Sequence, residues 1–370
     1  MKGVERAAMW NLKMNNLLAR AAALGASDLH LSCGHSPFFR VDGGLSADDS
    51  LPPLNEESLM ALLSEILCPE QGARLKREKD LDCAFEADEP SLSFRLRLNC
   101  YWALGLPHAA IRLIPMKIPS LGELGLPEAL RSFCPRKKGL FLAAGPSGSG
   151  KSTTLAALVQ EINRTRRVHV VTLEDPVEFV YRSERSLIHQ REIGQDCASF
   201  PEGLRRALRQ DPDVILIGEM RDPETIAAAV TAAETGHLVL ATLHTQDAPQ
   251  TLDRIIDAFP PNQQPQVRNQ LSSSLLGVCS QQLVPAAGGG RTVAVELLTA
   301  TSAVRNAIHE GKTFQLRSLI QTGAAEGMRS MEQSLAWLVR RGRISEETAM
   351  DCAFDAAELQ RLLRALQGAQ

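Results

Sequence analysis

Aromatic residues and excess charge are both scarce in this sequence. Of 370 residues, 4% are Phe, Trp or Tyr, and the formal net charge is −3 with a pI near 6.3. Proteins that bind single strands stack bases on aromatic side chains, and proteins that bind duplex DNA neutralise its phosphates with clustered Lys and Arg. We therefore predict no nucleic-acid partner.

Long hydrophobic runs and cysteine pairs are also absent. No stretch approaches the roughly 18 apolar residues of a membrane span, and Arg20 interrupts the apolar segment NLLARAAAL, so no signal-peptide core forms there. None of the eight cysteines lies within four residues of another, which excludes a zinc-type pair. Scattered cysteines suit a reducing cytosol, and we expect each to be a small buried hydrophobe. We predict a cytoplasmic protein whose contact with any membrane complex is peripheral.

The first part of the chain, residues 1–116, is predicted to be an α+β domain. NLLARAAAL and NEESLMALLSEIL have the apolar spacing of helices, whereas SFRLRLNCYWA and HAAIRLIP alternate apolar and polar residues as strands do. The stretch 115–127, PMKIPSLGELGLP, is rich in Pro and Gly and is the predicted linker.

The second part, residues 117–370, is predicted to be an α/β domain. Short apolar runs (LFLAA, VHVVTL, VILIG, HLVLATLH) alternate with helical segments, which indicates a mostly parallel sheet covered on both faces. One helix has complete start and stop signals: Asp222 as N-cap, Pro223 at its first position and Gly236 beyond its end. From about residue 300 the pattern is helical.

A phosphate-binding loop is predicted between the first of these strands and the helix that follows. The nine residues of GPSGSGKST match G-x-x-x-x-G-K-[ST] in full. They are Gly145, Pro146, Ser147, Gly148, Ser149, Gly150, Lys151, Ser152 and Thr153. Glycines let backbone N–H groups close around phosphate oxygens, and the helix N-terminus adds positive potential. We expect Lys151 to reach the β- and γ-phosphates of ATP and Ser152 to ligate Mg²⁺.

Acidic residues follow two other predicted strands, where open α/β sheets bind ligands. In many P-loop NTPases an Asp follows an apolar run such as VILI in DPDVILIGEMRDPE, but here Gly218 and then Glu219 follow it. In-line attack by water needs a carboxylate near the γ-phosphate, so Glu219 is the predicted catalytic base. Glu174 and Asp175 follow the neighbouring strand and are predicted to hold Mg²⁺ through water. Capping of the turn before Pro176 is the alternative for this pair.

Two histidines and three arginines lie near these predicted strands. His237 and His244 bracket one strand, and about seven residues of strand separate them by roughly 23 Å, so they cannot share a metal ion. We predict that His244 senses the γ-phosphate and that His237 is structural or lies at a subunit contact. Three arginines in GLRRALRQDPD have two interpretations, a solvated basic face or a role across a subunit boundary. They are Arg205, Arg206 and Arg209.

Taken in order, these motifs resemble those of the secretion ATPase superfamily, and within it the PilT-type retraction ATPases of type IV pili. GASDLHLS and FRVDGGL are similar to the start of that family's N-terminal PAS-like domain, and GPSGSGKSTTLA to its Walker A motif. TLEDPVEFV with HQREIG resembles its Asp box, DPDVILIGEMRDPETI its Walker B with Gly-Glu, and AAETGHLVLATLHT its His box.

The resemblance implies a homo-hexameric ATPase in which a PAS-like domain precedes a RecA-like P-loop domain with a C-terminal helical extension, and ATP lies between them. It assigns the catalytic role to Glu219. It also implies that turnover moves the domains and drives an inner-membrane platform protein. The missing four-cysteine zinc element and longer N-terminal region favour retraction over assembly or type II secretion.

Two stretches depart from the family pattern. SAVRNAIHEGK resembles the retraction motif AIRNLIRE and implies roles for Arg305, Asn306 and Glu310, but His309 stands where that motif has Arg. NCYWALGLPHAAIR lacks an arginine that relatives carry. The resemblance leaves three arginines of the N-terminal domain as candidates for contact with the phosphates: Arg95, Arg97 and Arg112. A regulatory ring ATPase that hydrolyses little ATP is therefore a second hypothesis.

Overall fold

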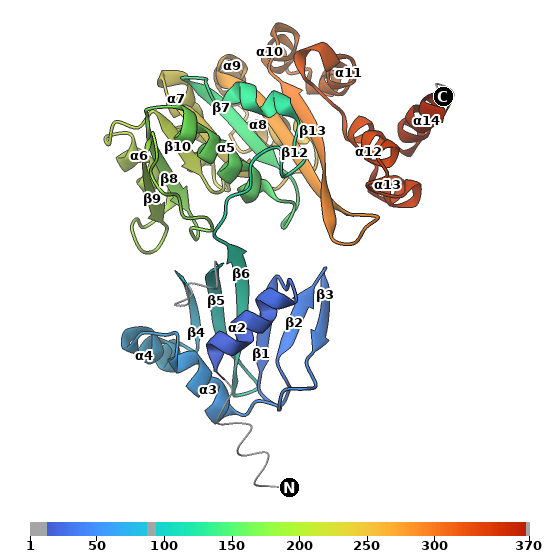
Figure 1. Ribbon diagram of the computed structural model, residues 1–370. Helices are drawn as coiled ribbons and strands as arrows, with labels where there is room; N and C mark the ends of the chain where they lie inside the picture. Colours follow the sequence, from blue (N-terminus) through green and yellow to red (C-terminus); the bar gives the residue numbers. More distant parts are fainter. Residues whose placement is uncertain (1–12, 87–93, 368–370) are drawn as a thin grey trace. The chain divides into compact units, whose positions relative to one another are not determined.

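The computed structural model describes residues 13–86 and 94–367, and the chain forms two compact units, Met1–Lys117 and Ile118–Gln370 (Figure 1). We call these the N-terminal unit and the C-terminal unit. Each has a sheet and a hydrophobic core of its own.

The N-terminal unit is built on a six-stranded sheet in the order β3-β2-β1-β6-β5-β4, and every neighbouring pair is antiparallel. Its elements are α2 (Met14–Ala23), β1 (Asp28–Ser32), β2 (Phe38–Val41), β3 (Gly44–Ala47), α3 (Glu56–Ser64), α4 (Pro69–Glu78), β4 (Asp80–Glu86), β5 (Phe94–Ala103) and β6 (Leu106–Pro115). Leu17 of α2 and Leu59 of α3 pack into one core with Leu98 of β5. The strands alternate as predicted because one face of the sheet is covered.

The C-terminal unit contains a seven-stranded sheet in the order β13-β12-β7-β11-β10-β8-β9. Its elements up to the last strand are η1 (Glu128–Phe133), β7 (Gly139–Ala144), α5 (Lys151–Thr165), β8 (His169–Glu174), β9 (Leu187–Glu192), α6 (Phe200–Ala207), β10 (Val214–Ile217), α7 (Pro223–Thr235), β11 (Leu238–Leu243), α8 (Ala248–Asp257), α9 (Gln264–Ser274), β12 (Leu275–Pro285) and β13 (Arg291–Thr299). All pairs are parallel except β12 with β13. The expected α/β fold is confirmed, with an antiparallel hairpin added at one edge.

Burial and capping explain where these elements begin and end. Every residue of β7, β10 and β11 is buried, so these strands have the continuous apolar sequences of a sheet covered on both faces. The predicted signals of α7 are confirmed: the Asp222 side chain accepts a hydrogen bond from the Thr225 amide at 2.8 Å, Pro223 is the first residue, and Gly236 ends the helix with φ 131°.

The chain after residue 300 is helical, as predicted. It contains α10 (Ser302–His309), η2 (Thr313–Gln315), α11 (Leu316–Thr322), η3 (Ala324–Glu326), α12 (Met331–Arg340), α13 (Glu346–Cys352) and α14 (Ala356–Gln367). Figure 1 shows α12, α13 and α14 beside the β12–β13 hairpin. Met331 and Leu335 of α12 share a core with Val284 of β12, which holds these helices to the edge of the sheet.

Two predictions about absent features can be compared with the structure. Within residues 13–86 and 94–367, no helix has the length and apolar character needed to cross a bilayer. Over those ranges no cluster of three or more His, Cys, Asp and Glu side chains could hold a metal ion. All eight cysteines are free, and four of them are buried as expected. The expectation is wrong for Cys68, which is exposed just before α4, and for the half-buried Cys83, Cys197 and Cys352.

Candidate nucleotide site

The predicted phosphate loop connects β7 to α5, and its backbone requires glycine at both ends. Gly145 has φ 142° and Gly150, the residue before α5, has φ 90°. A Cβ at position 145 would lie 2.4 Å from the carbonyl oxygen of Gln281 and 2.5 Å from Ser149 Oγ. The loop therefore packs directly against β12, and no side chain fits at its first residue.

Lys151 is buried beneath this loop and is bonded to it. Its Nζ donates hydrogen bonds of 2.8 Å to the carbonyl oxygens of Gly145 and of Pro146. Burial lowers the pKa of Lys151, while the negative charges of Glu219 and Glu178 act in the opposite direction. Both carboxylates therefore favour the charged form of the Lys151 ammonium.

The remaining loop residues differ in exposure. Pro146, Ser147, Gly148 and Ser152 are exposed, and Thr153 is half-buried in the first turn of α5. Ser149 is 2% exposed, and its hydroxyl is buried with no hydrogen-bond partner among the described residues. The helix N-terminus therefore presents both open backbone and hydroxyl groups, the donor set that phosphate and Mg²⁺ require.

Glu219 lies two residues after the end of β10, and its carboxylate contacts Arg221 and His244. Arg221 Nε is 2.6 Å and His244 Nε2 is 3.2 Å from the same oxygen, Oε1. Desolvation raises the pKa of Glu219, but hydrogen bonds and charge from Arg221 and His244 outweigh it, and the pKa is lowered overall. The carboxylate is consequently ionised at neutral pH. His244 follows β11, the neighbouring strand, so the sheet itself brings this pair together.

Gly218 explains why no Asp follows β10 directly. Its amide donates a 2.8 Å hydrogen bond to the carbonyl oxygen of Leu173, and its own carbonyl accepts one from Thr242 Oγ1. A Cβ at 218 would lie 3.2 Å from the Leu173 oxygen and 3.3 Å from Glu174 Cα. The close approach of β8 disfavours any side chain here, and the first acid is placed one residue later.

Glu174 ends β8 and is held by neighbouring side chains. Its Oε1 accepts hydrogen bonds from Thr172 Oγ1 at 2.7 Å and from Gln190 Nε2 at 3.1 Å. Burial raises the pKa of Glu174 to about 6, although these bonds and one from the Glu178 backbone oppose the rise. Both the capping interpretation and the contact with Mg²⁺ through water stay predictions for this pair. Asp175 is exposed.

Other predicted residues lie apart from the phosphate loop. His237 Nδ1 is 3.0 Å from the carbonyl oxygen of Ala232 near the end of α7, a structural contact. The three arginines around α6 are exposed: Arg205 lies 3.6 Å from Glu224, and Arg206 pairs with Glu202 one turn earlier. The exposure of these three arginines fits a solvated basic face. A role for them across a subunit boundary stays a prediction.

Arg97 and Arg112 belong to the N-terminal unit, where they are directly opposite each other on β5 and β6. Arg112 Nε donates a 2.9 Å hydrogen bond to Asp28 Oδ1. Arg97 is half-buried. Two adjacent guanidinium groups on one sheet face suit an anionic ligand, and their contact with phosphate stays a prediction.

In α10, the residues that resemble the retraction motif have different roles. Arg305 is half-buried and donates to the carbonyl oxygens of Ser273 at 2.9 Å and Leu275 at 2.7 Å, which caps the end of α9. Asn306 Nδ2 donates to Glu310 Oε1 at 3.1 Å, and His309 is exposed. Arg305 therefore has a structural role, whereas Asn306, His309 and Glu310 are exposed.

Sequence reasoning missed Arg221 and Gln190. Arg221 lies two residues after Glu219, on the same side of an extended segment, and this alternation is a usable signal. Gln190 lies in β9, far along the chain from Glu174, and only the pairing of β8 with β9 brings them together.

The fold and this site define a P-loop ATPase. Residues 4–303 match the sequence profile of the family described as "Type II/IV secretion system protein", and the chain belongs to this family. It is 45% identical to the "Type IV pilus retractation ATPase PilT" of Pseudomonas aeruginosa over 92% of this chain and 98% of that protein. It is also 45% identical to the "Twitching motility protein" of Neisseria gonorrhoeae over 85% of this chain and 83% of that one.

A solved structure supports the same assignment. The crystal structure of "the Pilus Retraction Motor PilT and Bound ADP" superposes with a TM-score of 0.86 at 43% identity, covering 95% of this chain and 100% of that one. That relative binds a nucleotide. The resemblance inferred from the sequence motifs is confirmed.

Proposed function

We propose that this chain hydrolyses ATP to power retraction of type IV pili. The observation that carries the proposal is the ionised Glu219, which contacts Arg221 and His244. Glu219 follows β10 and the phosphate loop follows β7, so both lie at the carboxyl ends of the parallel strands. The printed names of the relatives, retraction ATPase and twitching motility protein, supply the process.

The geometry supports a simple sequence of events. Lys151 exchanges its bonds with loop carbonyls for phosphate oxygens and stabilises the charge that develops during transfer. Glu219 accepts a proton from the attacking water while the water oxygen bonds to the γ-phosphorus. The bond between the γ-phosphorus and the oxygen that bridges it to the β-phosphate breaks, which gives ADP and phosphate. Arg221 and His244 would hold the carboxylate ionised and oriented, and His244 would also sense the γ-phosphate.

The residues present also fit Mg²⁺. Ser152 exposes its hydroxyl in the first turn of α5, and Glu174 and Asp175 add carboxylates at the end of β8. Hard oxygen donors with room for water are what this ion prefers. When bound, Mg²⁺ would neutralise charge on the β- and γ-phosphates.

The proposed assembly follows the family resemblance. Residues 1–116 would form the PAS-like domain and 117–370 the RecA-like domain with its helical tail, in a homo-hexamer with ATP between the domains. Arg97 and Arg112 would contact phosphate from the N-terminal domain. The ring would work in the cytoplasm, in peripheral contact with an inner-membrane platform protein.

A second candidate function is a regulatory ring subunit that binds ATP and turns it over slowly. Trp102 and Ala103 end β5 and Leu104 begins the β5–β6 turn. The family resemblance implies an arginine in this stretch, and its absence motivates the second candidate. Steady-state ATP hydrolysis by the purified chain, compared with nucleotide binding, separates the two. Tight binding without turnover favours the regulator.

Deletion of the coding sequence in its piliated host tests the process. A retraction motor predicts cells with excess pili that no longer twitch, and complementation with the wild type but not with Glu219→Gln restores movement. Bald cells would indicate an assembly ATPase instead, and failed protein export would indicate type II secretion.

A further inference from the structure

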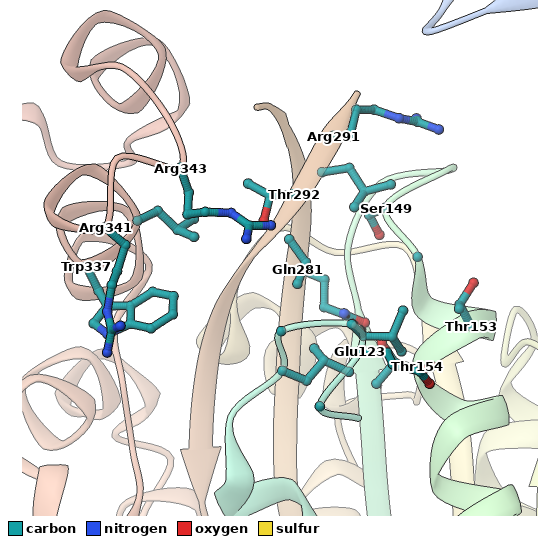
Figure 2. A pocket seen from close by; sticks show the side chains of 18 residues that line it. Glu123, Ser149, Thr153, Thr154, Gln281, Arg291, Thr292, Trp337, Arg341 and Arg343 are labelled. Carbon is teal, nitrogen blue, oxygen red and sulfur yellow. Dashed lines mark hydrogen bonds between the residues drawn. The ribbon is translucent and has the colours of Figure 1, made fainter. Parts of the chain in front are cut away.

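Cationic side chains gather in two places in the C-terminal unit. One group lies around a pocket of about 590 Å³, and Figure 2 shows Arg291, Arg341 and Arg343 among its side chains. Because Gly150 and Thr153 line the same pocket, this group adjoins the phosphate loop and the nucleotide site. The other group lies at the opposite edge of the sheet, where the proposed mechanism uses no residue.

Three segments form this second group, and each leads into a parallel strand. Residues 134–138 precede β7, residues 163–168 precede β8, and residues 182–187 run into the start of β9. Because β7, β8 and β9 run parallel in one sheet, their first residues lie at the same edge. The phosphate loop follows the last residue of β7, so the sheet separates these segments from the nucleotide site. We call the three segments the amino-edge patch.

Hydrogen bonds join the three segments of the patch. The Arg166 guanidinium donates to the carbonyl oxygen of Arg136 at 2.9 Å, and the carbonyl oxygen of Arg166 accepts from Ser186 Oγ at 2.9 Å. The Leu187 amide donates to the carbonyl oxygen of Val168 at 3.0 Å. The amino-edge patch is therefore one continuous surface.

The amino-edge patch is strongly basic in a chain that is acidic overall. Its sequences, CPRKK, NRTRRV and RSERSL, contain eight Arg and Lys residues and one acid, whereas the whole chain has a net charge of −3. The acid, Glu184, lies 3.5 Å from Arg164. Six exposed cations form no ion pair with any described residue: Arg136, Lys137, Lys138, Arg167, Arg182 and Arg185.

A neighbouring helix adds to the positive charge at the start of β7. Burial lowers the pKa of Arg305 in α10, and the positive charge of Arg136 lowers it further. Asp213, just before β10, lies at the same edge, but its Oδ2 accepts the His169 amide at 2.9 Å. Repulsion among the unpaired cations is thus relieved by anions from outside the chain.

One apolar side chain distinguishes between the possible anionic partners. Leu187 is 53% exposed within the patch. Cations around an exposed aliphatic side chain are typical of surfaces that bind at a membrane interface, where Lys and Arg contact anionic headgroups and the apolar group reaches the acyl boundary. The three segments contain no aromatic residue on which bases could stack, which disfavours single-stranded nucleic acid.

We propose that the amino-edge patch docks on anionic lipid headgroups, with Leu187 at the boundary of the acyl chains. This membrane contact goes beyond the proposed ATPase function and does not depend on ATP hydrolysis. It would give the chain an attachment of its own to the membrane, in addition to the platform protein of the proposed assembly.

Cosedimentation of the full chain with phosphatidylcholine vesicles, with and without phosphatidylglycerol, tests this contact. The wild type should bind the vesicles that contain phosphatidylglycerol, and salt at about 1 M should release it by screening the charges. Each Lys or Arg near an anionic membrane strengthens binding about fivefold, so the double variant Lys137→Ala/Lys138→Ala should bind about 25-fold more weakly. Leu187→Ala should bind about fivefold more weakly, because less apolar surface is buried.

Two controls separate the patch from total charge and from the nucleotide site. Lys76→Ala/Arg77→Ala removes two exposed cations from α4 and should bind vesicles as the wild type does. Lys151→Ala should also bind them normally, so a failure of the proposed phosphate site leaves the result unchanged. The patch variants should hydrolyse ATP in solution at the wild-type rate, which shows that they fold.

Three outcomes would overturn the lipid contact. Equal binding of the wild type to the two kinds of vesicle would exclude recognition of anionic headgroups. Undiminished binding by Lys137→Ala/Lys138→Ala would place the lipid contact on another surface. Salt-sensitive binding of duplex DNA at lower protein concentrations than the vesicles require would make the patch a nucleic-acid surface instead.

Discussion

The two sheets of this chain differ in how many faces they bury, and this difference decides where each can hold polar chemistry. Residues of β5 in the N-terminal unit alternate between buried and half-exposed, whereas all residues of β7, β10 and β11 in the C-terminal unit are buried. A sheet covered on both faces can present polar groups only at strand ends. A sheet with one open face can present polar groups along that face, and Arg97 and Arg112 on β5 and β6 are examples.

The comparison predicts that the C-terminal unit supplies nucleotide binding and chemistry, and that the N-terminal unit adjusts the rate. Each prediction below tests one side of it, beginning with the largest effect.

Lys151→Ala should weaken ATP binding by about a hundredfold and abolish hydrolysis, because a buried charged donor to phosphate is lost. Equilibrium binding and phosphate release measure the two effects. Arg164→Ala, near the other end of α5, should leave both unchanged. ATP affinity retained in Lys151→Ala would move the phosphate site elsewhere.

Gly218→Ala should destabilise the C-terminal unit by about 2 kcal/mol, because the added Cβ meets the β8 backbone. Gly72→Ala is the matched change in the N-terminal unit: Gly72 lies in α4 with open space around its missing Cβ, so alanine should be neutral or stabilising by about 0.5–1 kcal/mol. Urea unfolding of both variants gives the two values. If the two substitutions change the free energy of unfolding equally, the backbone around position 218 accommodates a Cβ without loss of stability.

Arg97→Ala should lower kcat about tenfold while ATP affinity changes less, as expected for a group that stabilises developing charge. Arg74→Ala, which removes an exposed helix ion pair in the same unit, should change neither. Steady-state kinetics supplies both parameters. A loss of affinity with kcat intact would mean that the N-terminal unit binds substrate rather than adjusting the rate.

Arg221→Ala should shift the acidic limb of the kcat–pH profile to higher pH. Burial raises the pKa of Glu219, and Arg221 is among the groups that lower it, so removing Arg221 raises that pKa. The base works only when ionised, so activity is lost earlier on acidification. Arg205→Ala, an exposed arginine near Glu224, is the control. A profile that does not move would show that His244 alone keeps Glu219 ionised.

Sequence reasoning succeeded where one local pattern determines the structure. The P-loop, the cap at Asp222 and the fully apolar strand before Gly218 depend on neighbouring residues, and all could be predicted. The β12–β13 hairpin was harder, because CSQQLVP contains Gln281, a polar residue that tertiary packing buries completely. The carboxylate of Glu296 on β13 is likewise buried at the start of α8, where it accepts the Ala248 amide at 2.8 Å. Such partners, like Arg221 and Gln190, depend on strand pairing, which no local pattern specifies.

The position of Glu219 after a glycine is the central point of this account. The most direct measurement is ATP turnover of Glu219→Gln, compared with its nucleotide affinity under the same conditions. Glutamine keeps the shape but cannot accept the proton, so we predict a fall in kcat of about a thousandfold with affinity changed only a few fold. Turnover at the wild-type rate would show that another group activates the water.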